Sequence, residues 1–162
     1  MLRYVVLGKY SQDFLSGLIY NPQDRKKAAA AMMKKAGAEW AEGESYLHIN
    51  HPNEIDSALE ESLRRLRNIG IRLLNQSVLL KNVNDCSDVL IALSEHLYSC
   101  EVTPYYLHLL DPVEGAAHFH VDKARIKAVY SEMQRVLPGF LLPRLVKETP
   151  GEPSKTIVCV ND

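Results

Sequence analysis

From Tyr46 onward, short apolar runs alternate with amphipathic segments, and this alternation is what most constrains the fold. Such a pattern predicts three strands, each followed by a helix. The predicted strands span residues 46–50, 71–78 and 104–109, and the predicted helices span residues 54–69, 86–99 and 122–136. Buried strands that alternate with helices favour a parallel sheet with right-handed crossovers. We therefore expect an α/β chain that forms part of a (β/α) barrel.

The first forty residues have a different character. Residues 4–10 alternate and are rich in Val and Tyr, which predicts a strand, and residues 21–35 predict an Ala/Lys-rich helix. This strand and helix resemble the first half of the small GYD domains, which form ferredoxin-like dimers. The sequence character changes at residues 41–44. We therefore expect a GYD-like βα segment of ferredoxin-like character at 1–42, followed by the partial barrel at 43–162.

Composition and charge restrict the partners and the location. The 162 residues carry a formal net charge of -1, and charges of both signs alternate along the chain. We therefore expect no basic surface that would bind nucleic acid or an anionic membrane. No apolar run approaches the length of a bilayer span, and the N-terminus lacks the pattern of a secretory signal. Three cysteines without a framework spacing suit a reducing compartment. We expect a cytoplasmic chain.

One lysine gives the chain a chemical interpretation. Residues 149–156, Thr-Pro-Gly-Glu-Pro-Ser-Lys-Thr, form a Gly/Pro-rich loop that places Lys155 close to its end. A lysine amine can condense with an aldehyde cofactor, and a tight loop limits the directions in which that amine points. Taken alone, the segment is a weak signal that favours a solvated loop lysine.

Several blocks occur in the order found in the lysine 2,3-aminomutase family, and together they run from about residue 46 to residue 156. The blocks are residues 48–56, 74–80, 82–85, 104–108, Asp111, 118–119 and 149–156. This part of the chain therefore resembles the C-terminal portion of such an enzyme. The resemblance implies an isomerase that moves an amino group within lysine.

The resemblance also assigns roles to particular residues. Lys155 would carry pyridoxal phosphate, His48 and Gln76 would contact S-adenosylmethionine, and Asp111 and Glu148 would pair with the ammonium groups of a lysine-like substrate. In a barrel the carboxyl ends of the strands carry the chemistry, and we expect these residues at such ends. Arg144 is a candidate for the cofactor phosphate, although a structural salt bridge explains it equally well. Asp111, before Pro112, is also a common way to begin a turn.

The family generates its radical at a 4Fe-4S cluster held by three closely spaced cysteines, and that motif is absent. Cys86, Cys100 and Cys159 are far apart, with no Cys-x-x-Cys pair. We therefore do not expect this polypeptide to catalyse the full reaction alone. Cys86 stands where some family members place a zinc ligand, but one thiol cannot build a structural zinc site. His118 and His120 are separated by one residue, as metal ligands on a strand can be, but they fit a surface or pocket-rim role better than a metal site, so we predict no metal site.

Three hypotheses follow from these observations. The chain is an aminomutase-like fragment that retains pyridoxal phosphate binding, or a non-catalytic module that docks onto a cluster-bearing partner chain, or a dimerisation unit built on the GYD-like segment. A partial barrel exposes a sheet edge, which another chain, the N-terminal segment or a second copy would have to cover.

Overall fold

The computed structural model describes residues 44–68, 70–112 and 114–160, and a five-stranded sheet forms its centre. The strands lie side by side in chain order: β1 Glu44–Leu47, β2 Arg72–Leu79, β3 Val102–Leu109, β4 Arg144–Lys147 and β5 Thr156–Ile157. The first four strands are parallel, whereas β5 pairs antiparallel with β4. The prediction of an α/β chain with a mostly parallel sheet is therefore confirmed.

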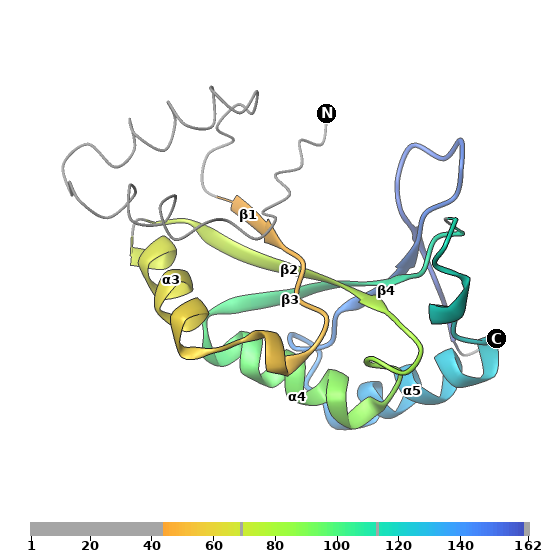
Figure 1. The fold of residues 1–162 in the computed structure, drawn as a ribbon, viewed down its shortest axis with the longest axis horizontal. Helices are drawn as coiled ribbons and strands as arrows, with labels where there is room; N and C mark the ends of the chain where they lie inside the picture. Colours follow the sequence, from red (N-terminus) through yellow and green to blue (C-terminus); the bar gives the residue numbers. More distant parts are fainter. Residues whose placement is uncertain (1–43, 69, 113, 161–162) are drawn as a thin grey trace.

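Three helices lie on one side of this sheet (Figure 1). They are α3 Ser57–Asn68, α4 Ser87–Ser99 and α5 Lys123–Val136. The core lies between the helices and the sheet, and its most deeply buried side chains come from both layers: Leu63, Leu90, Leu93, Met133, Leu73, Leu79, Val102 and Leu107. Right-handed connections between parallel strands that follow one another in the sheet place every connecting helix on the same side. The other side of the sheet is therefore left uncovered by these helices.

Element boundaries differ from the predicted ones at identifiable positions. The helix predicted from residue 54 begins at Ser57, because Pro52–Glu54 forms a separate 3-10 turn capped by His51 and Glu54. The alternating pattern did not reveal β4 and β5. His118 lies on a 3-10 turn, Ala117–Phe119, and not on a strand as its spacing from His120 had allowed.

The described sheet is open, so a partial barrel stays a prediction. The predicted GYD-like segment at 1–42 lies outside the described residues.

Two buried asparagines fasten the loops at the carboxyl ends of the strands. The amide of Asn75 accepts from the backbone N–H of Ile49 and donates to the carbonyl of Ile49, both at 2.9 Å. The amide of Asn84 donates to the carbonyls of Asn50 and Val78, each at 2.8 Å. Buried polar groups persist where every partner is satisfied. The loop after β1, which carries His48, is therefore held against β2.

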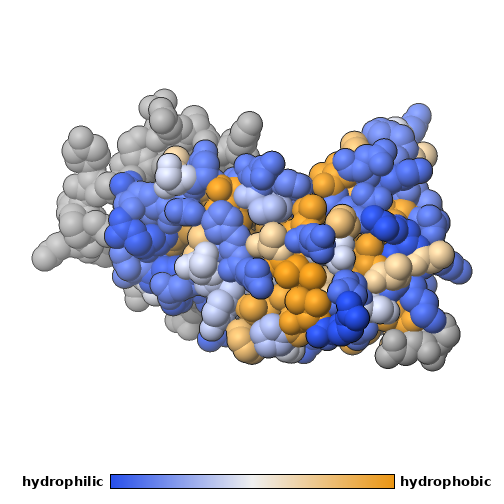
Figure 2. Space-filling model, turned by 90° about the horizontal axis from the view of Figure 1, so that it is seen from below, coloured by the Kyte–Doolittle hydropathy of each residue, from blue (hydrophilic) through white to orange (hydrophobic). Residues whose placement is uncertain are grey.

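The outer surface of the helix layer carries a few exposed apolar side chains. Val136 is 51% exposed and Phe140 is 62% exposed, and the ring of Phe140 lies 5.4 Å from that of Tyr98. Figure 2 looks onto this side of the molecule and shows apolar residues gathered between hydrophilic ones. Among the described helices, none is long and apolar enough to span a membrane.

Candidate functional site

A cavity of about 320 Å³ is lined by strand side chains and by the loop between β4 and β5. This loop rises on the side of the sheet away from the helices (Figure 1). Three neighbouring strands present side chains to it in one row, because Gln76 on β2 is in register with Tyr106 on β3, and Tyr106 with Arg144 on β4. Alternate residues of a strand face the same side, which is why this row forms. The loop between β4 and β5 completes the cavity with Glu148 and Lys155. Side chains from three strands and one loop thus line a single cavity.

A bulge explains why two consecutive tyrosines line the cavity. The pairing of β2 with β3 shifts between Asn75 and Gln76, and Tyr105 is the extra residue on β3. An extra residue in a strand breaks the simple alternation and re-aims a side chain. The rings of Tyr105 and Tyr106 lie 3.9 Å apart, and Tyr46 on β1 lies 6.1 Å from Tyr105. These rings give the cavity an aromatic wall.

Lys155 lies in the loop between β4 and β5, as the sequence predicted. Its side chain is 13% exposed, and its Nζ donates to Oε1 of Glu148 at 2.5 Å. That hydrogen bond and the lysine charge lower the pKa of Glu148. The amine is thus held at the cavity by a carboxylate from the same hairpin.

A tight turn sets the course of this loop. The backbone N–H of Glu152 donates to the carbonyl of Thr149 at 3.1 Å, with Pro150 and Gly151 between them. Gly151 has a φ of 88°, which together with the preceding proline is typical of a type II turn. Figure 1 shows this hairpin loop rising from the sheet on the side away from the helices.

Burial and the positive charge of Lys155 lower the pKa of two histidines. Burial, followed by the Lys155 charge, lowers the pKa of His108 to about 4, so its ring is neutral at pH 7. The ring Nε2 of His108 lies 3.1 Å from Oε1 of Gln76, which can only accept, so Nε2 carries the proton. Burial and the same lysine charge lower the pKa of His48. A positive charge on Lys155 therefore disfavours a second and a third one beside it.

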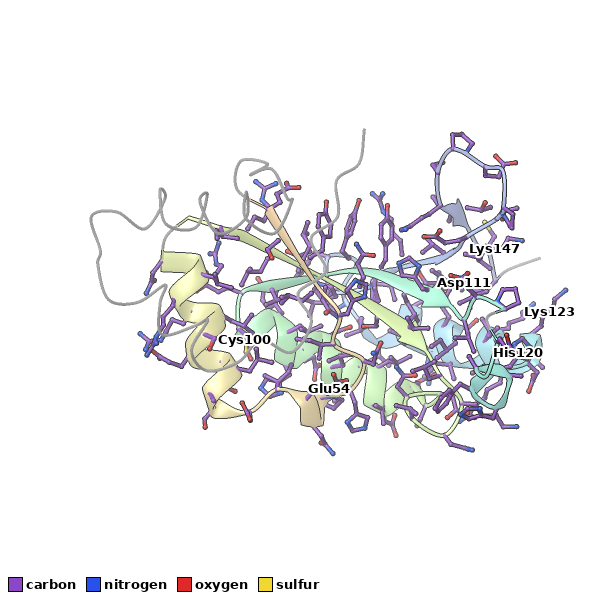
Figure 3. The ribbon with its side chains drawn as sticks, turned by 45° about the horizontal axis from the view of Figure 1, so that its top comes forward. Glu54, Cys100, Asp111, His120, Lys123 and Lys147 are labelled. Atoms are coloured by element: carbon purple, nitrogen blue, oxygen red, sulfur yellow. The ribbon has the colours of Figure 1, made fainter. Side chains whose placement is uncertain are left out.

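The predicted residues separate into two groups. Lys155, Glu148 and Gln76 line the cavity, and His48 lies near enough for Lys155 to affect its pKa. Asp111 is exposed beyond the end of β3 and does not line the cavity, and Figure 3 labels it there. The placement of Gln76 at a strand end was wrong, because it lies in the middle of β2.

Sequence reasoning missed His108 and gave the tyrosines no role. The spacing of two between Tyr106 and His108 on a strand was the available signal, since it places them on one side. Sequence reasoning also missed a cluster remote from the cavity, in which ligand atoms of Glu60, His96 and Cys100 lie within 4.8 Å of one another.

This architecture defines an α/β protein with helices on one side of a mostly parallel sheet and a lysine-bearing cavity on the other. No protein-family model matches the chain. Sequence relatives do: L-lysine 2,3-aminomutase of Escherichia coli is 48% identical over 109 residues, and that of Haemophilus influenzae is 46% identical over 110 residues. These stretches cover 67% and 68% of this chain and 32% of each relative.

A third relative extends the match. L-lysine 2,3-aminomutase of Acetoanaerobium sticklandii is 34% identical over 140 residues, which is 86% of this chain and 33% of the relative. The chain spans about a third of the length of the curated relatives it matches. It belongs to the lysine 2,3-aminomutase family, and the match fits a C-terminal fragment of such an enzyme.

Proposed function

We propose that this chain is the pyridoxal phosphate-binding part of a lysine 2,3-aminomutase-like isomerase, with Lys155 as the residue that holds the cofactor covalently. The observation that carries the proposal is the position of Lys155, whose side chain is 13% exposed at the rim of an aromatic cavity. Lysine side chains are mostly exposed unless they are paired, and here the pair with Glu148 holds the amine at the cavity.

The residues around Lys155 fit the cofactor. Its ring is planar and aromatic, and the tyrosine wall formed by Tyr46, Tyr105 and Tyr106 offers surfaces on which such a ring packs. Its phosphate needs a cation, and Arg144 lines the same cavity. A volume of about 320 Å³ lies at the lower end of the range for small-molecule sites.

Several side chains would prepare the amine of Lys155. An amine attacks a carbonyl only when it is unprotonated, so the ion pair with Glu148 has to open before the cofactor attaches. His108 is neutral at pH 7 and adds no positive charge beside the amine, and the proton that the ammonium loses would pass to water. Pyridoxal phosphate, when bound, supplies an electron-accepting ring that lets an attached amino group migrate between neighbouring carbons.

When Lys155 is bonded to the cofactor, Glu148 would lose its ammonium partner and become available to a substrate. A carboxylate left in the cavity without its ammonium partner favours a cationic ligand, and lysine carries two ammonium groups. Glu148 lines the cavity whereas Asp111 does not, so we give Glu148 the leading role in substrate binding and Asp111 a role only if the segment after β3 moves. His48 and Gln76 remain the candidates for S-adenosylmethionine.

We further propose that these 162 residues do not turn over lysine alone and depend on a cluster bound outside them, such as one on a partner chain, since their cysteines lack the spacing for a 4Fe-4S cluster. Cys86, Cys100 and Cys159 are free thiols, in keeping with a cytoplasmic location.

Borohydride reduction tests the cofactor assignment. The purified chain is incubated with pyridoxal phosphate, reduced and digested, and its peptides are mapped by mass spectrometry. Label concentrated on Lys155 and absent from Lys155→Ala supports the proposal. Lys147→Arg is the matched control, because Lys147 is an exposed lysine on β4 (Figure 3). Successive residues of a strand face opposite sides, so Lys147 does not share the side of Arg144 and Val146, which line the cavity. Label spread equally over many lysines would refute it.

A further inference from the structure

Two helices bring together a set of metal-binding side chains far from the lysine cavity. Glu60 lies on α3, His96 lies on α4, and Cys100 is the C-cap of α4. The ring Nε2 of His96 lies 2.9 Å from Oε1 of Glu60, and the ligand atoms of all three residues lie within 4.8 Å of one another. None of these residues lines the cavity around Lys155.

Local helix geometry explains the positions of two of the three side chains. His96 and Cys100 are four residues apart, so they project from the same side of the helix end. The backbone N–H of Cys100 donates to the carbonyl of His96 at 3.2 Å, which fixes their relative position. The spacing therefore presents an imidazole and a thiol to whatever lies beside the end of α4.

Packing of α3 against α4 supplies the third side chain. Arg67 near the end of α3 forms an ion pair with Glu101, the residue after Cys100. A second connection is the hydrogen bond between Glu60, in the first turn of α3, and His96, in the last turn of α4. Both contacts hold α3 beside the end of α4, and Figure 3 labels Cys100 in this region. The three donors are thus brought together by the fold before any ion arrives.

The geometry points to a zinc site: we propose that Glu60, His96 and Cys100 bind one Zn²⁺ with a water molecule as the fourth ligand. Imidazole, thiolate and carboxylate are the donors that zinc uses in proteins. Ligand atoms around a tetrahedral zinc stand roughly 3.5 Å apart given the usual bond lengths. Zinc binding would require side-chain rotations that bring ligand atoms now within 4.8 Å of one another to that spacing.

Binding follows a simple balance of charge and protons. Zinc replaces the thiol proton of Cys100, which passes to water, and the Nε2 proton of His96 moves through solvent to Nδ1, so the imidazole binds zinc as a neutral ligand. The carboxylate and the thiolate together neutralise the two charges of the ion. The bound metal would join α3 to α4 and stabilise the folded chain.

Cobalt(II) titration of the full, metal-free chain tests this site, since cobalt bound by a thiolate in a four-coordinate site absorbs visible and near-ultraviolet light. We expect one equivalent of cobalt to produce the thiolate band and zinc to abolish it. Cys100→Ser should remove the band, whereas Cys86→Ser and Cys159→Ser should keep it. Loss of a ligand should weaken zinc binding at least about tenfold, since even residues that only support ligands contribute 10–100-fold.

A second readout guards against a variant that misfolds. His96 and Glu60 are partly exposed, so His96→Gln and Glu60→Gln should keep the melting temperature of the metal-free chain. Zinc should raise the melting temperature of the unsubstituted chain and not that of the variants. Absence of a cobalt band at saturating metal, a band that survives in Cys100→Ser, or equal zinc stabilisation of every variant would each overturn the proposal. The outcome is independent of pyridoxal phosphate labelling.

Discussion

Lys155 and Glu148 stand seven residues apart and form an ion pair in which Nζ lies 2.5 Å from Oε1. The two partners differ in exposure, because the lysine side chain is 13% exposed and the glutamate side chain is 55% exposed. The pair therefore keeps a reactive amine at the cavity while the carboxylate remains accessible to solvent. Its strength governs both the stability of the hairpin and the availability of the amine.

Replacing Glu148 by Gln should lower the free energy of unfolding by up to about 1 kcal/mol at pH 7, which is the usual value for a solvent-accessible ion pair. The folded-state pKa of Glu148 is depressed, so its contribution is present above the ordinary value of 4.5 and is lost as the pH falls through the folded-state pKa. Urea denaturation at pH 7 and at pH 3 measures the difference. An equal difference at both pH values would contradict this account.

Replacing His108 by Gln should flatten the dependence of stability on pH. The folded-state pKa of His108, about 4, is below its ordinary value of 6.5, so the unfolded chain takes up the proton first and stability falls as the pH drops from 6.5 towards 4. Between pH 6.5 and pH 4 the unsubstituted chain should lose about 1–2 kcal/mol more free energy of unfolding than His108→Gln. This is less than the full pKa shift would give, because the ring is partly solvated.

Urea denaturation of His108→Gln at pH 7, 6, 5 and 4 checks the prediction. Gln can still hydrogen-bond to Gln76, so the substitution removes the titration and keeps a polar partner. His120→Gln is the control, since His120 is exposed. Parallel pH profiles for His108→Gln and the unsubstituted chain would refute it.

Replacing Asn75 by Leu should destabilise the chain by about 1–3 kcal/mol, because the buried N–H of Ile49 loses its acceptor. The carbonyl of Ile49 keeps a donor in Ser77, so the cost arises mainly from the N–H. Asn53→Leu is the matched control at an exposed position. The midpoint of chemical denaturation gives the comparison, and similar losses for both variants would show that burial of the amide is not the cause.

Replacing Gly151 by Ala should cost about 1 kcal/mol and slow labelling of Lys155. A side chain at this position meets no atom within 4 Å, so only the φ of 88° opposes it. Gly139→Ala is the control, because that site is equally open and no left-handed φ is recorded there. Thermal unfolding and the rate of borohydride labelling test the prediction together. Unchanged labelling would show that the turn does not position the amine.

The α/β repeat was predictable because each of its helices carries an apolar stripe long enough to show its period. The helix α3 places Leu63 in the core at the position its spacing requires. The hairpin of β4 and β5 was not predictable, since strands of four and two residues are too short for a pattern and their formation depends on pairing with β3.

The site was predictable only in part for related reasons. Lys155, Glu148 and Gln76 came from the family resemblance, and all three line the cavity. The aromatic wall depends on the bulge opposite Asn75, for which Pro104 within β3 was the local signal that had not been used. The third member of the metal cluster, Glu60, depends on how α3 packs, whereas the spacing of His96 and Cys100 was visible in the sequence.

The antiparallel strand β5 limits where further strands can pair with the sheet. By pairing with Val146 and Lys147, it occupies the outer hydrogen-bonding groups of β4, which a further parallel strand would need. At the opposite side, β1 pairs with β2 alone among the described strands. A barrel that includes this sheet would add strands beyond β1 or beyond β5, and a further strand could pair with Val146 and Lys147 of β4 only if β5 left them.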